Sequence, residues 1–140
     1  METESQKRIL VDGQNVLKHN GGKVNLENLE SLRQWSKENG IQLLIVLPKT
    51  GYHLDIFSKT SDIRFVNYRI HDDSALLQLA QQLKLPIISN DFYREFRDLY
   101  PDFNFDRVFP FDIVCNVFIT KANEFFRVDT KNMGIHHQKH

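Results

Sequence analysis

The sequence predicts an α/β fold with a mainly parallel central sheet that helices cover on both faces. Short apolar runs that end at turn residues alternate with longer segments whose apolar residues recur at helical spacing. Brief, continuous apolar runs are typical of buried parallel strands, and their alternation with helices indicates βαβ units. A chain of 140 residues has the length of one domain.

The first third of the chain predicts a strand, a helix and a second strand. Residues 8–11 form a brief apolar run that stops at Asp12, and residues 41–47 form another. The helix between them begins after the N-cap Asn25 and ends at Gly40, which can adopt the left-handed conformation that closes helices. The apolar stripe of this helix consists of Leu26, Leu29, Leu32 and Trp35.

The middle of the chain is less regular before the alternation returns. Residues 48–62 are polar, with one short helix expected at residues 54–57. Residues 63–68 predict a third strand, and a helix that Asp72 or Asp73 caps follows it. The inward-facing residues of this helix are Leu76, Leu77, Leu79, Ala80 and Leu83.

The last third predicts two further strands with a short amphipathic helix between them. The fourth strand covers residues 85–88, and the helix runs from Phe92 to about Leu99. Residues 107–119 are strand-like, and Pro110 within them predicts an edge position or a bend.

Composition is that of a globular protein, with 41% hydrophobic and 26% charged residues. We expect one domain over residues 8–128, with a flexible N-terminus at residues 1–7 and a mobile tail at residues 129–140. No apolar run is long enough to span a membrane. The lone Cys115 cannot form an internal disulfide, so we expect it to be buried and the protein to be cytoplasmic or nuclear. Because the net charge is zero, phosphate binding would require a local basic face.

Acidic residues follow three of the predicted strands. Asp12 follows the first strand, Asp72 and Asp73 open the helix after the third, and Asp91 follows the fourth. The carboxyl ends of the strands in an open parallel sheet form the crevice where ligands bind. Clustered carboxylates repel one another and their pKa values rise, so a cation is expected among them. Magnesium prefers such oxygen ligands and can activate a water, which predicts hydrolysis of phosphodiesters.

Each of these carboxylates also has an ordinary structural explanation. An Asp after a strand commonly serves as a turn or N-cap residue, and Asp72 and Asp73 are alternative caps for the same helix. The hypothesis of a site therefore depends on the joint position of these residues at one edge of the sheet.

Three sequence blocks together resemble a known family. They are Ile9-Leu10-Val11-Asp12-Gly13-Gln14-Asn15-Val16, His71-Asp72-Asp73-Ser74-Ala75-Leu76-Leu77 and Ile88-Ser89-Asn90-Asp91-Phe92-Tyr93-Arg94-Glu95. In order and spacing, over residues 8 to 120, they resemble the NYN branch of the PIN-like nucleases, and most closely the Regnase-like ribonucleases. The resemblance implies a PIN-like three-layer sandwich, a Mg²⁺ or Mn²⁺ cofactor and endonucleolytic cleavage of single-stranded or loop RNA.

The resemblance also implies roles for individual residues. Asn15 looks like the polar residue that steadies the site by bonding to a carboxylate or to a metal-bound water. Glu95 stands where the family usually has Asp and is one methylene longer, which implies a secondary or water-mediated role. The chain departs from the family at residues 48–69 and in lacking a CCCH zinc finger. The residues that look like the acidic metal site are Asp12, Asp72, Asp73 and Asp91.

Further residues near the predicted sheet edge are candidates for substrate contact. Phe92 and Tyr93 could stack on bases, with core packing of one of them as the alternative. His53 and His71 are acid–base candidates for which a structural role is the simpler interpretation. The basic residues that could contact phosphates, or simply be solvated, are Lys18, Lys49, Arg69 and Arg94.

The leading functional hypothesis is a metal-dependent endoribonuclease. The alternative is a catalytically weak RNA-binding or scaffolding module of the same fold, which the neutral net charge and Glu95 leave open. A phosphatase or nucleotide-binding α/β protein is a weaker third hypothesis, because the sequence has no GxxxxGK[ST] phosphate-binding loop. PIN-like nucleases often pair, so the resemblance also implies a homodimer.

Overall fold

The computed structural model describes residues 7–57, 60–66 and 72–126. The strands form a five-stranded parallel sheet in the order β3-β2-β1-β4-β5 and a separate antiparallel hairpin, β6-β7. The strands are β1 (Arg8–Asp12), β2 (Gln42–Pro48), β3 (Ile63–Val66), β4 (Ile87–Ile88), β5 (Val108–Phe109), β6 (Phe111–Val114) and β7 (Val117–Thr120). The helices are α1 (Gly13–Leu17), α2 (Leu26–Asn39), α3 (Gly51–Phe57) and α4 (Asp72–Leu83), with 3₁₀ turns at Arg94–Phe96 and Phe105–Arg107 and helical residues at 122–126.

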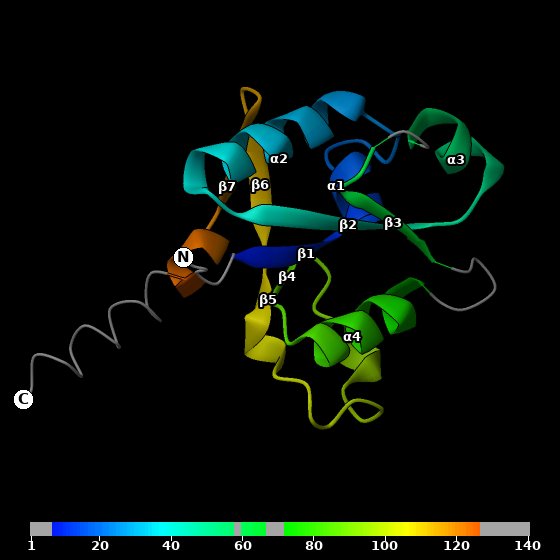
Figure 1. Ribbon diagram of the computed structural model, residues 1–140, viewed down its shortest axis with the longest axis vertical. Coiled ribbons are helices and arrows are strands. Elements are labelled where there is room, and N and C mark those ends of the chain that lie inside the picture. The colour runs from blue at the N-terminus through cyan, green and yellow to red at the C-terminus, as the bar shows by residue number, and fades with distance from the viewer. Residues whose placement is uncertain (1–6, 58–59, 67–71, 127–140) are drawn as a thin grey trace, which may run out of the picture.

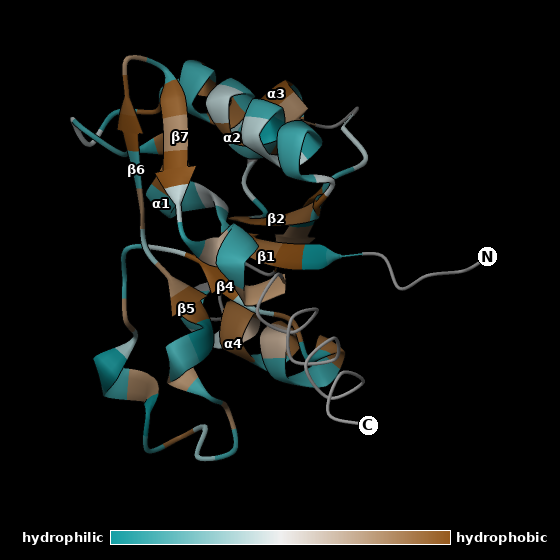
Figure 2. Ribbon diagram, turned by 90° about the vertical axis from the view of Figure 1, so that its left-hand side faces the viewer, coloured by the Kyte–Doolittle hydropathy of each residue, from teal (hydrophilic) through white to brown (hydrophobic). Residues whose placement is uncertain are grey.

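The sheet is the middle of three layers (Figure 1). Ile9 and Val11 pack on one face with residues of α1, α2, α3 and the hairpin. Leu10, which points the opposite way along the same strand, packs with α4 on the other face. Both sides of β1 are therefore buried, which is why its sequence is a continuous apolar run (Figure 2). The predicted parallel sheet with helices on both faces is confirmed.

Both predicted ends of α2 are confirmed. The side chain of Asn25 accepts a hydrogen bond of 3.0 Å from the backbone N–H of Glu27. Gly40 ends the helix with a φ of 64°, the left-handed conformation that glycine adopts at low cost. Trp35 is 7% exposed and its ring lies 5.9 Å from that of Phe118. Leu29, Leu32 and Trp35 of the predicted stripe thus pack in the core, whereas Leu26 at the start of α2 is 46% exposed. Leu83, predicted to face inward from the last turn of α4, is likewise 40% exposed.

Residues 92–99 do not form the predicted amphipathic helix. The only helical turn there is the 3₁₀ turn Arg94–Phe96. Tyr93 adopts a φ of 54°, which an α-helix cannot contain, so no helix runs from Phe92 through Tyr93. The Tyr93 side chain is fully buried. Of the two candidate stacking residues, Tyr93 therefore belongs to the core, while Phe92 is 39% exposed.

Residues 107–119 form three short strands and not one. β5 ends the parallel sheet, and the chain bends at Pro110 into the β6-β7 hairpin, as the proline predicted. Cys115 and Asn116 connect β6 to β7 with φ angles of 51° and 62°, the geometry of a type I′ turn. The turn places Cys115 at an exposed position, so the prediction of a buried cysteine is wrong.

The predicted flexible residues 1–7 and the tail at 129–140 lie outside the described residues, apart from Lys7. Asn67 and Tyr68 at the end of the predicted third strand also lie outside them, and the two-residue β4 is shorter than the predicted run of 85–88. Among the described helices, none is long and apolar enough to cross a membrane.

The five-residue helix α1 was not predicted, because it is too short to show a helical period. Its first residue, Gly13, lies tightly against the carboxyl end of β2. A Cβ at this position would lie 2.6 Å from Cδ2 of Leu47 and 2.7 Å from the carbonyl oxygen of Val46. Only glycine therefore allows α1 to start directly after β1.

We expect Gly13→Ala to destabilise the protein by about 1–3 kcal/mol, the usual cost of overpacking, although alanine is the better helix former. Denaturant unfolding monitored by circular dichroism measures the change. Gly40→Asn is the control, because nothing lies within 4 Å of a Cβ there and asparagine tolerates the left-handed conformation. Equal stability of Gly13→Ala and wild type would contradict the steric argument.

Candidate active site

A polar cleft of about 440 Å³ opens at the carboxyl ends of β1 and β4. These strands are neighbours in the sheet, although the chain first runs outward from β1 to β2 and β3 and returns to place β4 on the other side of β1. Such a change of direction is where α/β sheets bind ligands. The residues that line the cleft are Asp12, Gln14, Asn15, Lys18, His19, Asn20, Asp73, Asn90 and Asp91.

Asp12 is the deepest carboxylate of the cleft and has three hydrogen-bond donors. Its Oδ1 accepts from the backbone N–H of Asn15 at 3.3 Å, which makes Asp12 the N-cap of α1. Its Oδ2 accepts from the Tyr93 hydroxyl at 2.8 Å and from Ser89 Oγ at 3.2 Å. Burial raises the pKa of Asp12, and the nearby charge of Asp91 adds to this, whereas the three hydrogen bonds lower the pKa and offset part of the rise.

The role of Tyr93 as a hydrogen-bond donor to Asp12 was not predicted from the sequence. Burial and the charge of Asp12 raise the pKa of Tyr93 far above its ordinary value, so its hydroxyl stays protonated and acts as a donor. The available signal was the chemistry of the residue, since a buried tyrosine needs a hydrogen-bond partner for its hydroxyl. The partner itself, 81 positions away in the chain, could not be identified without the fold.

The side-chain oxygen of Asn15 bonds to the backbone around the cleft. Its Oδ1 accepts from the backbone N–H of Asn90 at 2.7 Å, and Asn90 Oδ1 accepts in turn from the backbone N–H of Phe111 at 2.8 Å. These bonds tie α1, the end of β4 and the start of β6 together. The side-chain oxygen of Asn15 thus steadies the site through the main chain, and the implied bond of Asn15 to a carboxylate or to a metal-bound water stays a prediction.

The other predicted carboxylates come from two different segments. Asp91 Oδ1 accepts from the backbone N–H of Tyr93 at 2.8 Å, so Asp91 also serves as an ordinary turn residue. Asp73 lines the cleft from the first turn of α4. Asp72 is the first residue of α4, but its side chain lies outside what the structure describes. Asp72 and Asp73 are therefore inside the first turn of α4 and not before it as caps.

Lys18 and His19 form the basic side of the cleft. Lys18 was predicted, and His19 was not. His19 Nε2 lies 3.0 Å from Asp112 Oδ1, and its ring centroid lies 4.9 Å from that of Phe111. The hydrogen bond from His19 lowers the pKa of Asp112. No pattern in the sequence pairs these residues, which are 93 positions apart.

Several predicted residues do not line the cleft. Lys49, Arg94 and Glu95 are exposed outside it, and Arg69 and His71 lie outside the described residues. His53 is buried, with Nδ1 at 2.9 Å from the carbonyl oxygen of Pro48, which gives it the structural role that was the simpler interpretation.

The cleft suits a hydrated divalent cation better than a tightly caged one. Over the residues that the structure describes, no three His, Cys, Asp or Glu side chains lie close enough together to hold a metal ion. Magnesium, however, is usually held by one or two carboxylates and keeps several waters. Three carboxylates, Asp12, Asp73 and Asp91, line a cleft large enough for such an ion. A bound cation would stabilise the ionised form of Asp12 and so lower its raised pKa. The donors present therefore fit Mg²⁺ or Mn²⁺.

Two solved structures of nuclear proteinaceous (protein-only) RNase P 2, PRORP2, from Arabidopsis thaliana are similar to this chain. One has a TM-score of 0.64 and 21% sequence identity and covers 82% of this chain, and the other has a TM-score of 0.62 and 19% identity and covers 84%. This chain spans 29% and 30% of the length of those proteins. No protein-family model matches the sequence, and comparison with curated proteins finds no relative.

The structural likeness confirms the predicted fold, a PIN-like three-layer α/β sandwich with a mainly parallel central sheet. At this level of identity it shows nothing narrower than the fold. The similarity to Regnase-like ribonucleases therefore remains a prediction.

We expect Asp12→Asn to increase the free energy of unfolding at neutral pH. A carboxyl whose pKa is raised in the folded state stabilises the fold fully below its unfolded pKa, near 3.8, and loses this contribution as pH rises through the folded pKa. A permanently neutral amide keeps the contribution, which amounts to about 1.4 kcal/mol for each unit of the shift.

Urea unfolding at a series of pH values measures this effect. The gain should be largest near pH 7 and disappear below pH 4, and the exposed Asp98→Asn should show no such gain. If Asp12→Asn lowered the free energy of unfolding at neutral pH, the conclusion that burial destabilises the charged form of Asp12 would be contradicted.

We expect Tyr93→Phe to raise the pKa of Asp12 further, because it removes a donor to Oδ2. Stability at neutral pH should fall by about 1.5–3 kcal/mol, the range for hydrogen bonds to charged groups. Carboxyl-carbon NMR titration follows Asp12 directly, with the exposed Tyr52→Phe as the matched control. An unchanged Asp12 titration would show that the hydroxyl does not act on this carboxylate.

Proposed function

We propose that the protein hydrolyses phosphodiester bonds in RNA as a Mg²⁺- or Mn²⁺-dependent endoribonuclease. The observation that carries the proposal is that Asp12, Asp73 and Asp91, from three separate segments, line one cleft at the point where the sheet changes direction. The fold shared with RNase P structures supports RNA as the substrate.

In this proposal Asp12, Asp73 and Asp91 hold the metal, one or two of them directly and the others through its bound waters. Asp72, the first residue of α4, is proposed as a fourth acidic residue of the metal site. A bound metal would orient a water, lower its pKa and stabilise negative charge on the phosphoryl oxygens. Asp12 acts from a fixed position, because Tyr93 and Ser89 hold its Oδ2. A carboxylate that does not reorganise is suited to place an ion accurately.

The basic side of the cleft positions the substrate. Lys18 and His19 lie beside the carboxylates, where the ammonium group of Lys18 and a ring N–H of His19 can bind the phosphates that flank the bond to be cut. Contacts of this kind orient a strand without reading its sequence. Single-stranded or loop RNA is proposed as the substrate because the resemblance to PIN-like nucleases implies it.

The test is cleavage of a labelled stem-loop RNA by the purified protein with Mg²⁺ or Mn²⁺. Asp91→Asn and Asp73→Asn should each lower the rate by about a hundredfold or more, as expected for the loss of a catalytic group. The exposed Asp98→Asn, outside the cleft, should cleave like wild type. Metal binding is measured independently, as a rise in melting temperature that the cleft variants lose.

Two outcomes would decide against the proposal. Equal cleavage by wild type and by the cleft variants would assign the activity to a contaminant or to another site. RNA binding that survives chelation, with no product formed, would favour the catalytically weak RNA-binding module of the same fold.

A further inference from the structure

The ring of His19 has a defined position in the cleft. Its Nε2 lies 3.0 Å from Oδ1 of Asp112, and its centroid lies 4.9 Å from that of Phe111. The backbone is held as well, because the carbonyl oxygen of His19 accepts a hydrogen bond of 3.3 Å from the side chain of the buried Asn28. The His19 side chain is only 16% exposed, whereas the neighbouring Lys18 is exposed. Of the two basic residues in the cleft, His19 is therefore the one with a fixed side chain.

Asp112 determines which ring nitrogen of His19 can meet a bound molecule. The hydrogen bond from His19 lowers the pKa of Asp112, so Asp112 is an ionised acceptor at neutral pH and Nε2 carries the proton of this bond. Over the residues that the structure describes, Nδ1 of His19 has no hydrogen-bond partner. It is also not buried, since the buried side-chain polar atoms without a partner are Arg8 Nε and Gln14 Oε1. Nδ1 is therefore the ring nitrogen that faces solvent in the cleft.

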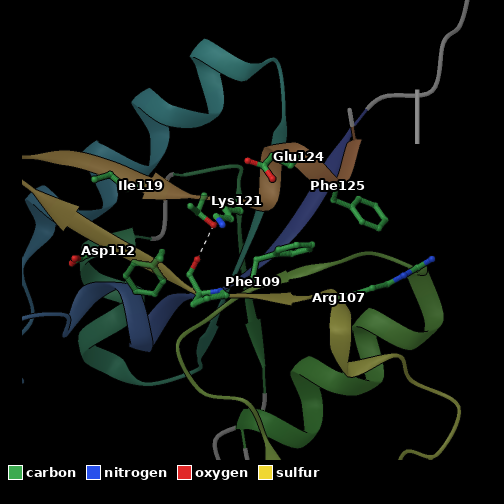
Figure 3. A pocket seen from close by; sticks show the side chains of 10 residues that line it. Arg107, Phe109, Asp112, Ile119, Lys121, Glu124 and Phe125 are labelled. Atoms are coloured by element: carbon green, nitrogen blue, oxygen red, sulfur yellow. Dashed lines mark hydrogen bonds between the residues drawn. The ribbon is translucent and has the colours of Figure 1, made fainter. Parts of the chain in front are cut away.

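The surroundings of Asp112 keep its carboxylate on His19. Oδ1 of Asp112 also accepts a hydrogen bond of 2.8 Å from the backbone N–H of Ile113, which fixes the carboxylate on β6. Asp112 borders a separate groove of about 1070 Å³ that contains the cation Arg107. Figure 3 shows Asp112 and Arg107 on opposite sides of this groove. In the described part of the chain, the ion-pair partner of Asp112 is therefore His19.

Hydrolysis of a phosphodiester needs a proton for the leaving oxygen as well as an attacking water. Carboxylates that hold a metal are ionised and have no proton to give. Among the described residues that line the cleft, the side chains that can carry a transferable proton are those of Lys18 and His19. Histidine is the residue that most often transfers protons in enzymes, because it gains and loses a proton near neutral pH. Proton transfer also requires a positioned donor, which favours His19.

We propose that His19 is the general acid of this site and that Asp112 is its positioning residue. The inference rests on the proposed function. In the reaction, the oxygen of a water bonds to phosphorus while the bond between phosphorus and the leaving ribose oxygen breaks. That oxygen keeps the electron pair of the broken bond and takes the proton from Nδ1 of His19, and the attacking water releases a proton to solvent. His19 is left neutral, with its Nε2–H still bonded to Asp112, and regains a proton from solvent.

Cleavage of two RNA substrates tests the proposal. One is ordinary RNA, and in the other sulfur replaces the leaving oxygen, which the product ends identify as 3′ or 5′. A thiolate leaves without a proton, because thiols have a pKa of about 8.5. His19→Gln should slow cleavage of the ordinary RNA by about 100- to 10,000-fold, the range for general acid–base catalysis. It should slow cleavage of the sulfur substrate by less than about tenfold. Asp112→Ala should show the same selectivity with a smaller loss.

Lys18→Gln is the matched comparison in the same cleft. A residue that contacts phosphates acts on both substrates, so this variant should slow both alike. Asp98→Ala, at an exposed position outside the cleft, should cleave both like wild type. His19→Gln should keep the metal-dependent rise in melting temperature, because the carboxylates that hold the metal are unchanged. Circular dichroism checks that each variant folds.

Several results would overturn the inference. Equal slowing of both substrates by a folded, metal-binding His19→Gln would do so and leave the proposed function intact, as would ordinary RNA cleaved at the wild-type rate. If His19→Gln does not fold, Asp112→Ala at its exposed side chain decides the question in the same way. Cleavage of both substrates by Asp91→Asn at the wild-type rate, or no cleavage by the wild type, would instead remove the proposed function and this inference with it.

Discussion

The position of the Asp12 carboxylate is the constraint on which the candidate site depends. β1 is buried on both faces, so its last residue carries a charge to the edge of the apolar core. Donors from three segments compensate this charge: the N–H of Asn15 at the start of α1, Ser89 after β4, and the buried hydroxyl of Tyr93. Even so, burial leaves the pKa of Asp12 raised. The fold therefore places the carboxylate of Asp12 where burial disfavours its charged form, and a cation bound in the cleft would stabilise that charge.

The same bonds explain irregularities in the chain around the site. Tyr93 adopts a left-handed conformation, and the predicted helix after β4 is interrupted there, because the ring packs inward with its hydroxyl on Asp12. The side-chain oxygen of Asn15 accepts a hydrogen bond from the backbone N–H of Asn90, and that of Asn90 accepts one from the backbone N–H of Phe111. The loops that carry Asp12 and Asp91 are consequently joined by hydrogen bonds. The segment after β4 is therefore not a regular helix, and its hydrogen bonds instead fix the residues that line the cleft.

The hairpin connects the cleft to the rest of the surface. Asp112 of β6 bonds to His19 in the cleft and also lines a groove with Phe109 and Phe125. Cys115 was predicted to be buried because a free cysteine usually is. The pairing of β6 with β7 instead places it in the exposed type I′ turn, which the sequence does not show.

The sequence by itself determined the parallel sheet, the ends of α2, and the arrival of Asp12, Asp73 and Asp91 at one sheet edge. These features follow from local signals, namely apolar runs, caps, and the rule that parallel strands end on the same side. Only the tertiary structure decided that Tyr93 and Ser89 hold Asp12, that His19 meets Asp112, and that Lys49, Arg94 and Glu95 lie outside the cleft. The physical reason is that hydrogen bonds between residues tens of positions apart depend on side-chain direction after packing, and no local period in the sequence encodes that direction.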